Sequence, residues 1–207
     1  VIGYSDMIYQ HDMSREDIKE AAWFIWNEGM HLEALSHKLM DLTILNKQNF
    51  VLWDMWAEEV IGEILKSLKP VLKKNDVMVQ TKIENAYIKA EYDLLKMLLF
   101  NLIDNAIKAD ATLIKVSGTM KEKRYEISIE DNGKGMAKEE LMKITEPFYM
   151  VDKSRSRRKH GVGLGLALAV KIGEIHGSQL FFESEKGKGC RVSFFLMCQK
   201  GGEKDEK

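Results

Sequence analysis

The chain has 207 residues, of which 45% are hydrophobic and 30% are charged. This composition excludes a disordered chain, and a content of only two prolines excludes a collagen-like or proline-rich chain. The length allows one or two domains with a buried core. Lysine and arginine number 31 against 32 aspartates and glutamates, a formal net charge of −1, so the chain as a whole has no field to attract nucleic acid or an anionic membrane.

The start of the chain and its two cysteines indicate in which cellular compartment the protein is found. Cys190 and Cys198 are too few for a disulfide framework or a four-ligand zinc site, which favours a reducing, cytoplasmic compartment. The longest apolar run, residues 94–103, is interrupted by polar residues and is shorter than the roughly 20 residues that cross a bilayer. The chain begins with Val1 and no cleavage signal follows. We therefore expect a cytoplasmic fragment, with any membrane anchor upstream.

Residues 1–50 are predicted to form a partial helical hairpin. Apolar residues recur at three- and four-residue steps over 18–42, the period of an amphipathic helix, and Ser14 is a suitable N-cap. Residues 1–9 would end a preceding helix. The apolar stripe of the second helix needs a partner other than water, which favours a homodimer, although a fragment with most of its first helix missing could equally be monomeric.

Residues 51–198 are predicted to form an α/β domain, followed by a charged, disordered tail over 199–207. Helices are expected over 54–74, 92–109 and 164–176, and strands over 77–83, 113–119, 125–131, 179–184 and 190–196. The first of these helices should be disturbed at Pro70. Helices mixed with hairpin-connected strands indicate a two-layer α/β sandwich of the α+β type, with helices on one face of a mixed, mostly antiparallel sheet.

Three polar residues, Asn101, Asn105 and Lys108, lie on one side of the helix expected over 92–109. Asparagine is a poor helix former, so its repeated use on this face favours a role in binding. Amide carbonyl oxygens can help to hold a hard cation, and Lys108 adds a positive charge for phosphate. A solvated face without a ligand is an equally open interpretation.

A glycine-containing motif, Asp131-Asn132-Gly133-Lys134-Gly135, follows an apolar strand. Gly133 and Gly135 would let the backbone approach a flat ligand, and Asp131 offers an acceptor to an amino group such as that of adenine. Taken alone, the motif is explained more simply as a hairpin turn, because Asn-Gly and Gly-x-Gly are common turn sequences.

A second glycine motif, with Gly161, Gly163 and Gly165, opens directly into the helix expected over 164–176. The N-terminus of a helix is a ready site for phosphate. The preceding basic residues would make a local anion site, although a solvated loop or a nucleic-acid patch would explain them as well: Lys153, Arg155, Arg157, Arg158 and Lys159. Rossmann and P-loop spacings are absent, as are the H-R-D and D-F-G elements of eukaryotic protein kinases.

These motifs, in this order, resemble those of bacterial sensor histidine kinases. Residues 101–108 are similar to the asparagine box, 131–135 to the first glycine box, 146–149 to the phenylalanine box and 161–166 to the second glycine box. The resemblance covers about 52–196 and implies the Bergerat (GHKL) ATP-binding domain shared with gyrase, mismatch-repair proteins and a heat-shock chaperone. Residues 1–8 and 14–45 resemble the end of the dimerisation and phosphotransfer hairpin.

The resemblance implies a role in ATP binding for each matching residue near the nucleotide. Asn105, with Asn101 nearby, would organise Mg²⁺ on the triphosphate, and Lys108 would contact phosphate. Asp131 would accept from the adenine amino group, while Gly133 and Gly135 would shape the adenine pocket.

The second glycine box and its neighbours would form a lid. Gly161, Gly163 and Gly165 would hinge this lid, and Leu164 is placed among the nucleotide-binding residues. Basic residues on it, Lys153 and Arg155, would reach the phosphates. Phe148 would anchor it as it closes.

The resemblance also implies the reaction, which is transfer of the γ-phosphoryl group of Mg-ATP to a histidine and then to an aspartate of a response regulator. ATP-hydrolysing relatives have a glutamate where this chain has Asn101, which cannot accept a proton. We therefore expect poor hydrolysis. None of the histidines fits the phosphoacceptor box, so the chain should not phosphorylate itself: His11, His31, His37, His160 and His176.

Two alternatives stay open at this stage. One is a Bergerat ATPase that hydrolyses ATP to drive a conformational change, and the other is a degenerate nucleotide-sensing module that transfers no phosphate. Ala109 also departs from the family, because many relatives have an aromatic residue there that packs near adenine, and this difference predicts weaker nucleotide affinity. No nucleic-acid partner is expected.

Overall fold

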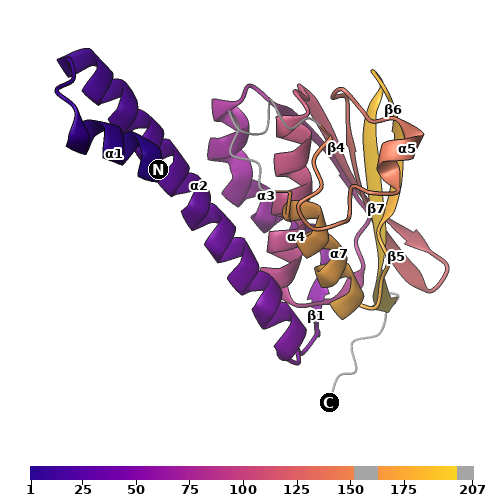
Figure 1. Cartoon of the computed structure of the whole chain (residues 1–207). Helices are drawn as coiled ribbons and strands as arrows, with labels where there is room; N and C mark the ends of the chain where they lie inside the picture. The colour runs from indigo at the N-terminus through magenta and orange to yellow at the C-terminus, as the bar shows by residue number, and fades with distance from the viewer. Residues whose placement is uncertain (152–162, 200–207) are drawn as a thin grey trace.

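The computed structural model describes residues 1–151 and 163–199. It consists of a helical arm and an α/β body (Figure 1). The arm is formed by α1 (Ile2–Gln10) and α2 (Arg15–Lys47). The elements of the body are β1 (Trp53–Trp56), α3 (Ala57–Lys74), β2 (Met78–Ile83), β3 (Tyr87–Ala90), α4 (Tyr92–Lys108), β4 (Leu113–Lys121), β5 (Arg124–Asp131), α5 (Lys138–Leu141), α7 (Gly165–Ile175), β6 (Phe181–Glu185) and β7 (Gly189–Gln199).

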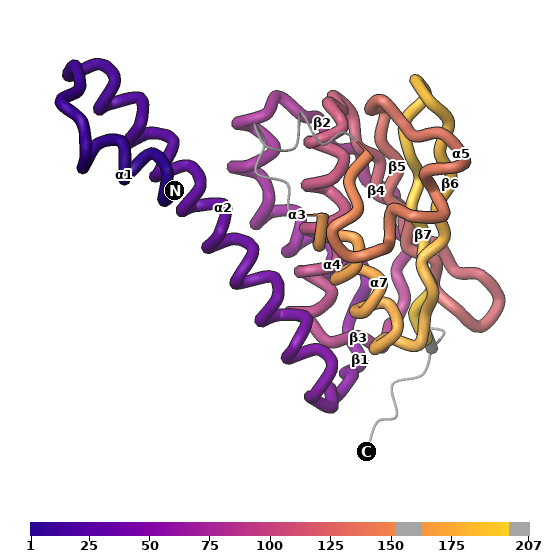
Figure 2. The backbone as a smooth tube through the Cα atoms, in the orientation of Figure 1, coloured from indigo at the N-terminus to yellow at the C-terminus, as the bar shows by residue number. Residues whose placement is uncertain are grey.

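The arm is a helical hairpin, as predicted. α1 packs against α2, with the rings of Tyr4 and Phe24 stacked 4.8 Å apart. Ser14 caps α2 by accepting a hydrogen bond from the backbone N–H of Asp17 at 3.1 Å. The first half of α2 extends away from the body (Figures 1 and 2), whereas Leu45 near its other end is buried in the core of the body. The two regions therefore share packing across the predicted boundary at residue 50.

The body is a two-layer α/β sandwich, which confirms the predicted fold class. Its sheet has the strand order β1-β3-β7-β5-β4-β2, with β6 also paired to β7. The β2–β4 pair is parallel and the other pairs are antiparallel. Helices α3, α4 and α7 cover one face of this sheet (Figure 1).

Apolar residues with the period of each element fill the space between the two layers. On β5 the alternate residues Tyr125, Ile127 and Ile129 are buried. The inward stripe of α3 is the one that its 3.6-residue periodicity predicts: Val60, Ile61, Ile64, Leu65, Leu68 and Leu72.

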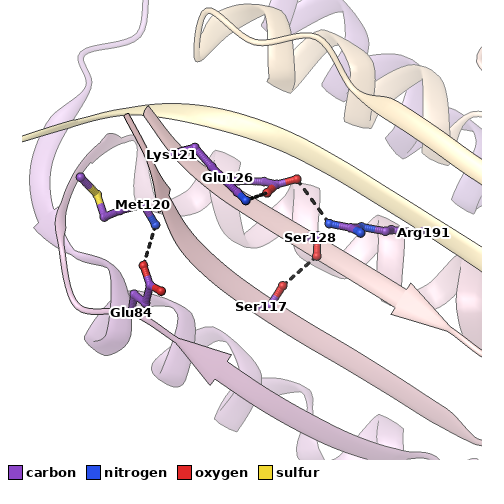
Figure 3. Close-up of polar contacts among 7 residues, drawn as sticks. All are labelled: Glu84, Ser117, Met120, Lys121, Glu126, Ser128 and Arg191. Carbon is purple, nitrogen blue, oxygen red and sulfur yellow. Dashed lines mark hydrogen bonds and ion pairs between the residues drawn. The ribbon is translucent and has the colours of Figure 1, made fainter. Parts of the chain in front are cut away.

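The opposite face of the sheet carries a group of polar side chains on β4, β5 and β7, beside the paired rings of Phe181 and Phe195. Figure 3 shows that the hydroxyl groups of Ser117 and Ser128 lie 2.8 Å apart across β4 and β5. The carboxylate of Glu126 on β5 forms ion pairs with Arg191 on β7 at 3.4 Å and with Lys121 on β4 at 4.0 Å. The hydroxyl and carboxylate groups of this cluster are paired within it, whereas the buried Nε atom of Arg191 has no hydrogen-bond partner among the described residues.

Two short strands were not predicted. β1 and β3 pair antiparallel over four residues each, so α3 begins at Ala57 and not at residue 54. β3 also pairs with the end of β7, and this partner extends β7 to Gln199 beyond the predicted end at 196. A strand of four residues is too short for alternation to be read from the sequence, and its pairing is decided by residues far away along the chain.

The predicted disturbance of α3 at Pro70 is wrong, because the helix continues through it to Lys74. Proline removes one backbone donor, but Pro70 is exposed, so water can satisfy the carbonyl group that loses its partner. The short helix α5 lies between β5 and α7, where no helix was predicted. Within the described ranges, no helix is both long and apolar enough to cross a membrane.

His176, at the end of α7, joins this helix to the start of α4. Its Nε2 atom accepts the backbone N–H of Glu91 at 3.1 Å, so its Nδ1–H donates to the carbonyl oxygen of Ile172 at 2.8 Å. The bond accepted by Nε2 requires the neutral ring. Burial lowers the pKa of His176 below 6.5, although the Ile172 carbonyl and the charge of Glu91 oppose this shift.

This geometry predicts a pH-dependent stability. As pH falls below 6.5, the unfolded chain takes up a proton on this ring while the folded chain does not, so the free energy of unfolding falls. The decline reaches at most about 1.4 kcal/mol per pH unit for a single group. Urea unfolding between pH 7.5 and 5.5 should show a steeper loss for the natural chain than for His176→Gln. Parallel profiles would contradict the assignment.

Candidate functional site

One cavity of about 310 Å³ lies among α4, the end of β5, the segment after it and the start of α7. Residues from all four sequence motifs line it together, from Leu102 in the first motif along the chain to Leu166 in the last. The described residues of its wall are Lys38, Leu102, Asn105, Ala106, Lys108, Ala109, Asp131, Lys134, Gly135, Met136, Ile144, Tyr149, Met150, Val151, Gly163, Gly165, Leu166, Phe182, Cys190 and Val192.

Helix α4 contributes Asn105 and Lys108 to the cavity. The side-chain nitrogen of Asn105 is buried and has no hydrogen-bond partner among the described residues. Lys108 pairs with Asp104 one turn earlier at 2.6 Å. A buried amide without a partner is costly, and it is satisfied when a polar ligand enters the cavity.

Asn101 does not line the cavity, although the sequence places it on the same side of α4 as Asn105. Its side chain is 5% exposed, and its Nδ2 atom donates to the carbonyl oxygen of Met97 at 2.9 Å. Its Oδ1 atom lies 3.0 Å from the point where a Cβ atom on Gly165 would stand. Asn101 therefore lies in the contact between α4 and α7, directly beside the cavity.

Asp131 lies at the end of β5 and its carboxyl group faces the cavity. Oδ1 accepts the backbone N–H of Gly133 at 2.7 Å. Burial raises the pKa of Asp131, while hydrogen bonds from the backbone of Gly133 and Cys190 lower it. A carboxylate has about four acceptor positions, so this group can still accept a hydrogen bond from a ligand.

The glycines of the first motif allow close backbone contacts. A Cβ atom on Gly133 would lie 2.8 Å from the carbonyl oxygen of Ala109, so this glycine permits contact with the end of α4 without lining the cavity. Gly135 does line the cavity, with φ of +61°, and a Cβ atom there would lie 2.0 Å from the carbonyl oxygen of Glu185. The motif is thus tied to both α4 and the β6–β7 turn.

The second glycine motif is brought to the cavity by Gly163 and Gly165, whereas Leu164 is buried behind them. The backbone N–H of Phe148 donates to the carbonyl oxygen of Gly163 at 2.9 Å. The Phe148 side chain is 55% exposed and is not part of the cavity wall. The predicted lid residues Lys153, Arg155 and Gly161 lie outside the described residues.

Sequence reasoning missed several residues of the wall. The apolar ones include Met136, Ile144, Leu166, Phe182 and Val192, whose hydrophobicity in the sequence does not distinguish them from core residues. Lys134 and Tyr149 lie within recognised motifs and could have been included on that basis. Lys38 comes from α2, in the arm, and no local signal distinguishes it from other lysines of an amphipathic helix.

The cavity is suited to a flat, partly apolar molecule that carries negative charge. Its apolar wall can cover an aromatic ring, and the Asp131 carboxylate can accept from a ring amino group. Lys38, Lys108 and the N-terminus of α7 supply positive charge. Among the described residues, no three His, Cys, Asp or Glu side chains could hold a metal ion. A cation could be held at Asn105 only if an anionic ligand supplied most of its oxygens.

The family model for histidine kinase-, DNA gyrase B- and HSP90-like ATPases matches residues 90–200. The sensor histidine kinase YkoH of Bacillus subtilis (strain 168) is 30% identical over 190 residues, which cover 90% of this chain and 41% of that relative. The chain thus spans less than half the length of this relative.

Two solved structures share the fold. The full-length structure of ShkA in complex with AMPPNP has a TM-score of 0.73 at 19% identity, covering 93% of this chain and 41% of that one. The histidine kinase ThkA in complex with the response regulator protein TrrA also has a TM-score of 0.73, at 21% identity, covering 95% and 56%.

The geometry of Gly135 predicts a large loss of stability for Gly135→Ala. The substitution would combine a strained positive φ with a contact against the Glu185 backbone. Gly187→Ala is a matched control, because Gly187 has φ of +83° and nothing near its Cβ position. In urea unfolding, the control should lose about 1 to 2 kcal/mol, and Gly135→Ala at least about 2 kcal/mol more, from overpacking. Equal losses would show that Gly135 makes no close contact.

Proposed function

Because the chain belongs to the family of histidine kinase-, DNA gyrase B- and HSP90-like ATPases, as the ATP-binding catalytic domain of a bacterial sensor histidine kinase, we propose that it binds Mg-ATP for phosphoryl transfer to a histidine. The histidine would be presented by a phosphotransfer helix, and the phosphoryl group would then pass to an aspartate of a response regulator.

One observation carries this proposal: Asn105, Asp131 and Gly163 line a single cavity. These residues come from three separate motifs, and each supplies a different part of the chemistry that a purine triphosphate needs. A carboxylate suits the purine amino group, and amide and glycine backbone groups suit the phosphates. If the three motifs were only a hairpin turn, a solvated helix face and a surface loop, nothing would require them to line the same cavity.

The residues nearest the base and the phosphates have these proposed roles. Asp131 accepts from the adenine amino group, beside the close backbone contacts of Gly133 and Gly135. Lys108 contacts phosphate. Mg²⁺ would supply charge neutralisation on the triphosphate, and the Asn105 side chain would help to hold it, since Mg²⁺ in such sites takes most of its ligands from phosphate and water.

The remaining predicted site residues belong to this proposal too. Asn101 supports the site from the contact between α4 and α7, and not from the cavity wall. Gly163, Leu164 and Gly165 would carry the phosphate-side backbone, with Phe148 held to Gly163 by its N–H. Lys153, Arg155 and Gly161 would complete the phosphate contacts.

Transfer to a histidine is favoured over hydrolysis by the groups around the phosphate end. Asn101 cannot act as a base, and its amide is bonded to the Met97 carbonyl oxygen. The Asp104 carboxylate is paired with Lys108. A site that positions and neutralises the triphosphate without activating water keeps ATP for another nucleophile.

The partners are part of the same proposal. A structural neighbour was solved in complex with a response regulator protein, which supports a regulator as the final phosphoryl acceptor. A homodimer through the arm is supported by exposed apolar side chains on α2, including Trp23, Leu32 and Leu39. We propose a cytoplasmic location, with residues 1–50 forming part of the dimerisation and phosphotransfer hairpin, without its acceptor histidine, and 51–198 forming the catalytic domain.

Binding of nucleotide is the first test. Calorimetric titration should give Mg-ATP binding that is at least about tenfold tighter than Mg-GTP, because the Asp131 carboxylate accepts from the adenine amino group and repels the guanine carbonyl. Asp131→Asn should abolish most of this preference. Asp54→Asn, on the exposed side of β1, should leave it unchanged. An Asp131→Asn variant with unchanged preference would contradict the assigned role of this carboxylate.

The fate of the γ-phosphate is the second test. Incubation with γ-labelled ATP should leave no acid-labile phosphate on the chain, because none of its histidines lies in an acceptor box. Steady release of phosphate should also be negligible, while a longer chain with an acceptor histidine becomes labelled. Sustained turnover would favour a Bergerat ATPase, and absence of Mg-ATP binding would favour a module without nucleotide chemistry.

A further inference from the structure

Lys38 reaches the cavity from outside the ATP-binding domain. It lies on α2, and the family match begins only at residue 90, yet its side chain forms part of the same wall as Asn105 and Asp131. The C-terminal half of α2 packs against α7 (Figure 1), and this contact brings Lys38 into place. Its Nζ atom lies 3.8 Å from the point where a Cβ atom on Gly165 would stand.

The surroundings of Lys38 favour an anion. Burial lowers its pKa, and the positive charge of Lys108 lowers it further, while the carboxylates of Asp104 and Asp41 act in the opposite direction. No hydrogen bond or ion pair of the Lys38 ammonium occurs within residues 1–151 and 163–199, although the side chain is half-buried. The Lys108 ammonium is already paired with Asp104 at 2.6 Å, whereas Lys38 faces the same cavity near the N-terminus of α7, where an anion would interact favourably with its charge.

We propose that Lys38 binds the terminal phosphates of the nucleotide, so that Mg-ATP links the helical arm to the ATP-binding domain. This inference rests on the proposed function, since it assigns a further residue to the same site. Asp131 would repel phosphate, so the phosphates must lie at the part of the cavity lined by Lys38, Lys108 and Gly165. The Lys38 ammonium then gains a charge-assisted hydrogen bond that the described part of the chain does not provide.

A consequence is that the phosphates help to hold α2 against α7. Leu45 anchors the end of α2 in the core regardless of ligand, whereas the contact at Lys38 depends on the anion. The position of the arm is thereby coupled to the number of phosphates in the cavity. A ligand that stabilises one arrangement can shift the equilibrium only by its differential interaction with that arrangement, and Lys38 provides such an interaction.

The test compares binding of Mg-ATP with binding of adenosine by calorimetry on the full chain. Lys38→Met should weaken Mg-ATP about tenfold, the effect of losing one charge-assisted hydrogen bond, and should leave adenosine within about twofold. Lys38→Arg keeps the charge and should bind Mg-ATP within about threefold of the natural chain. Lys47→Met, at an exposed position of the same helix, is the matched control and should match the natural chain for both ligands.

Each other outcome overturns the proposal in a distinct way. If Lys38→Met binds Mg-ATP as tightly as the natural chain, Lys38 does not contact phosphate, and the proposed function stands without it. If Mg-ATP and adenosine weaken together, Lys38 only maintains the packing of α2. If the natural chain binds neither ligand, the proposed function itself fails, and this proposal fails with it.

Discussion

The close contact between the end of α4 and the segment after β5 is the constraint on which the site depends. The backbone N–H of Lys134 donates to the carbonyl oxygen of Ala109 at 3.0 Å, and a Cβ atom on Gly133 would stand only 2.8 Å from the same oxygen. This contact holds the Asp131 carboxylate beside the last turn of α4, where Asn105 and Lys108 lie. A larger residue at 133 would separate these groups, so the glycine acts here by being small.

The second constraint is the packing of α7 against α4, which places the second glycine motif opposite the first. Asn101 lies in this contact beside Gly165. At the other end of α7, His176 accepts a hydrogen bond from the backbone N–H of Glu91, at the start of α4. The buried layer of aliphatic side chains between helices and sheet makes both helices rigid. A rigid frame of this kind holds separate polar groups around one cavity, and the Asn105 amide nitrogen, which has no partner among the described residues, marks where a ligand is needed.

The arm adds a third wall to this cavity through Lys38. The contact of α2 with α7 and the burial of Leu45 mean that the hairpin and the catalytic domain are not independent units in this arrangement. If Lys38 binds phosphate as proposed, the arm and the ATP-binding domain share one ligand. The electrostatic interaction between Lys38 and Lys108 makes that sharing sensitive to the charge in the cavity.

The amino-acid sequence by itself determined the long amphipathic helices, the alternating strands β4 and β5, the Ser14 cap and the motif residues Asn105, Lys108 and Asp131, because periodicity and residue chemistry are local properties. Only the tertiary structure decided the pairing of β1 with β3, the position of Asn101 between two helices and the arrival of Lys38 at the cavity. These depend on contacts between residues far apart in the chain, where the helix or strand period carries no information about which neighbour a side chain will meet.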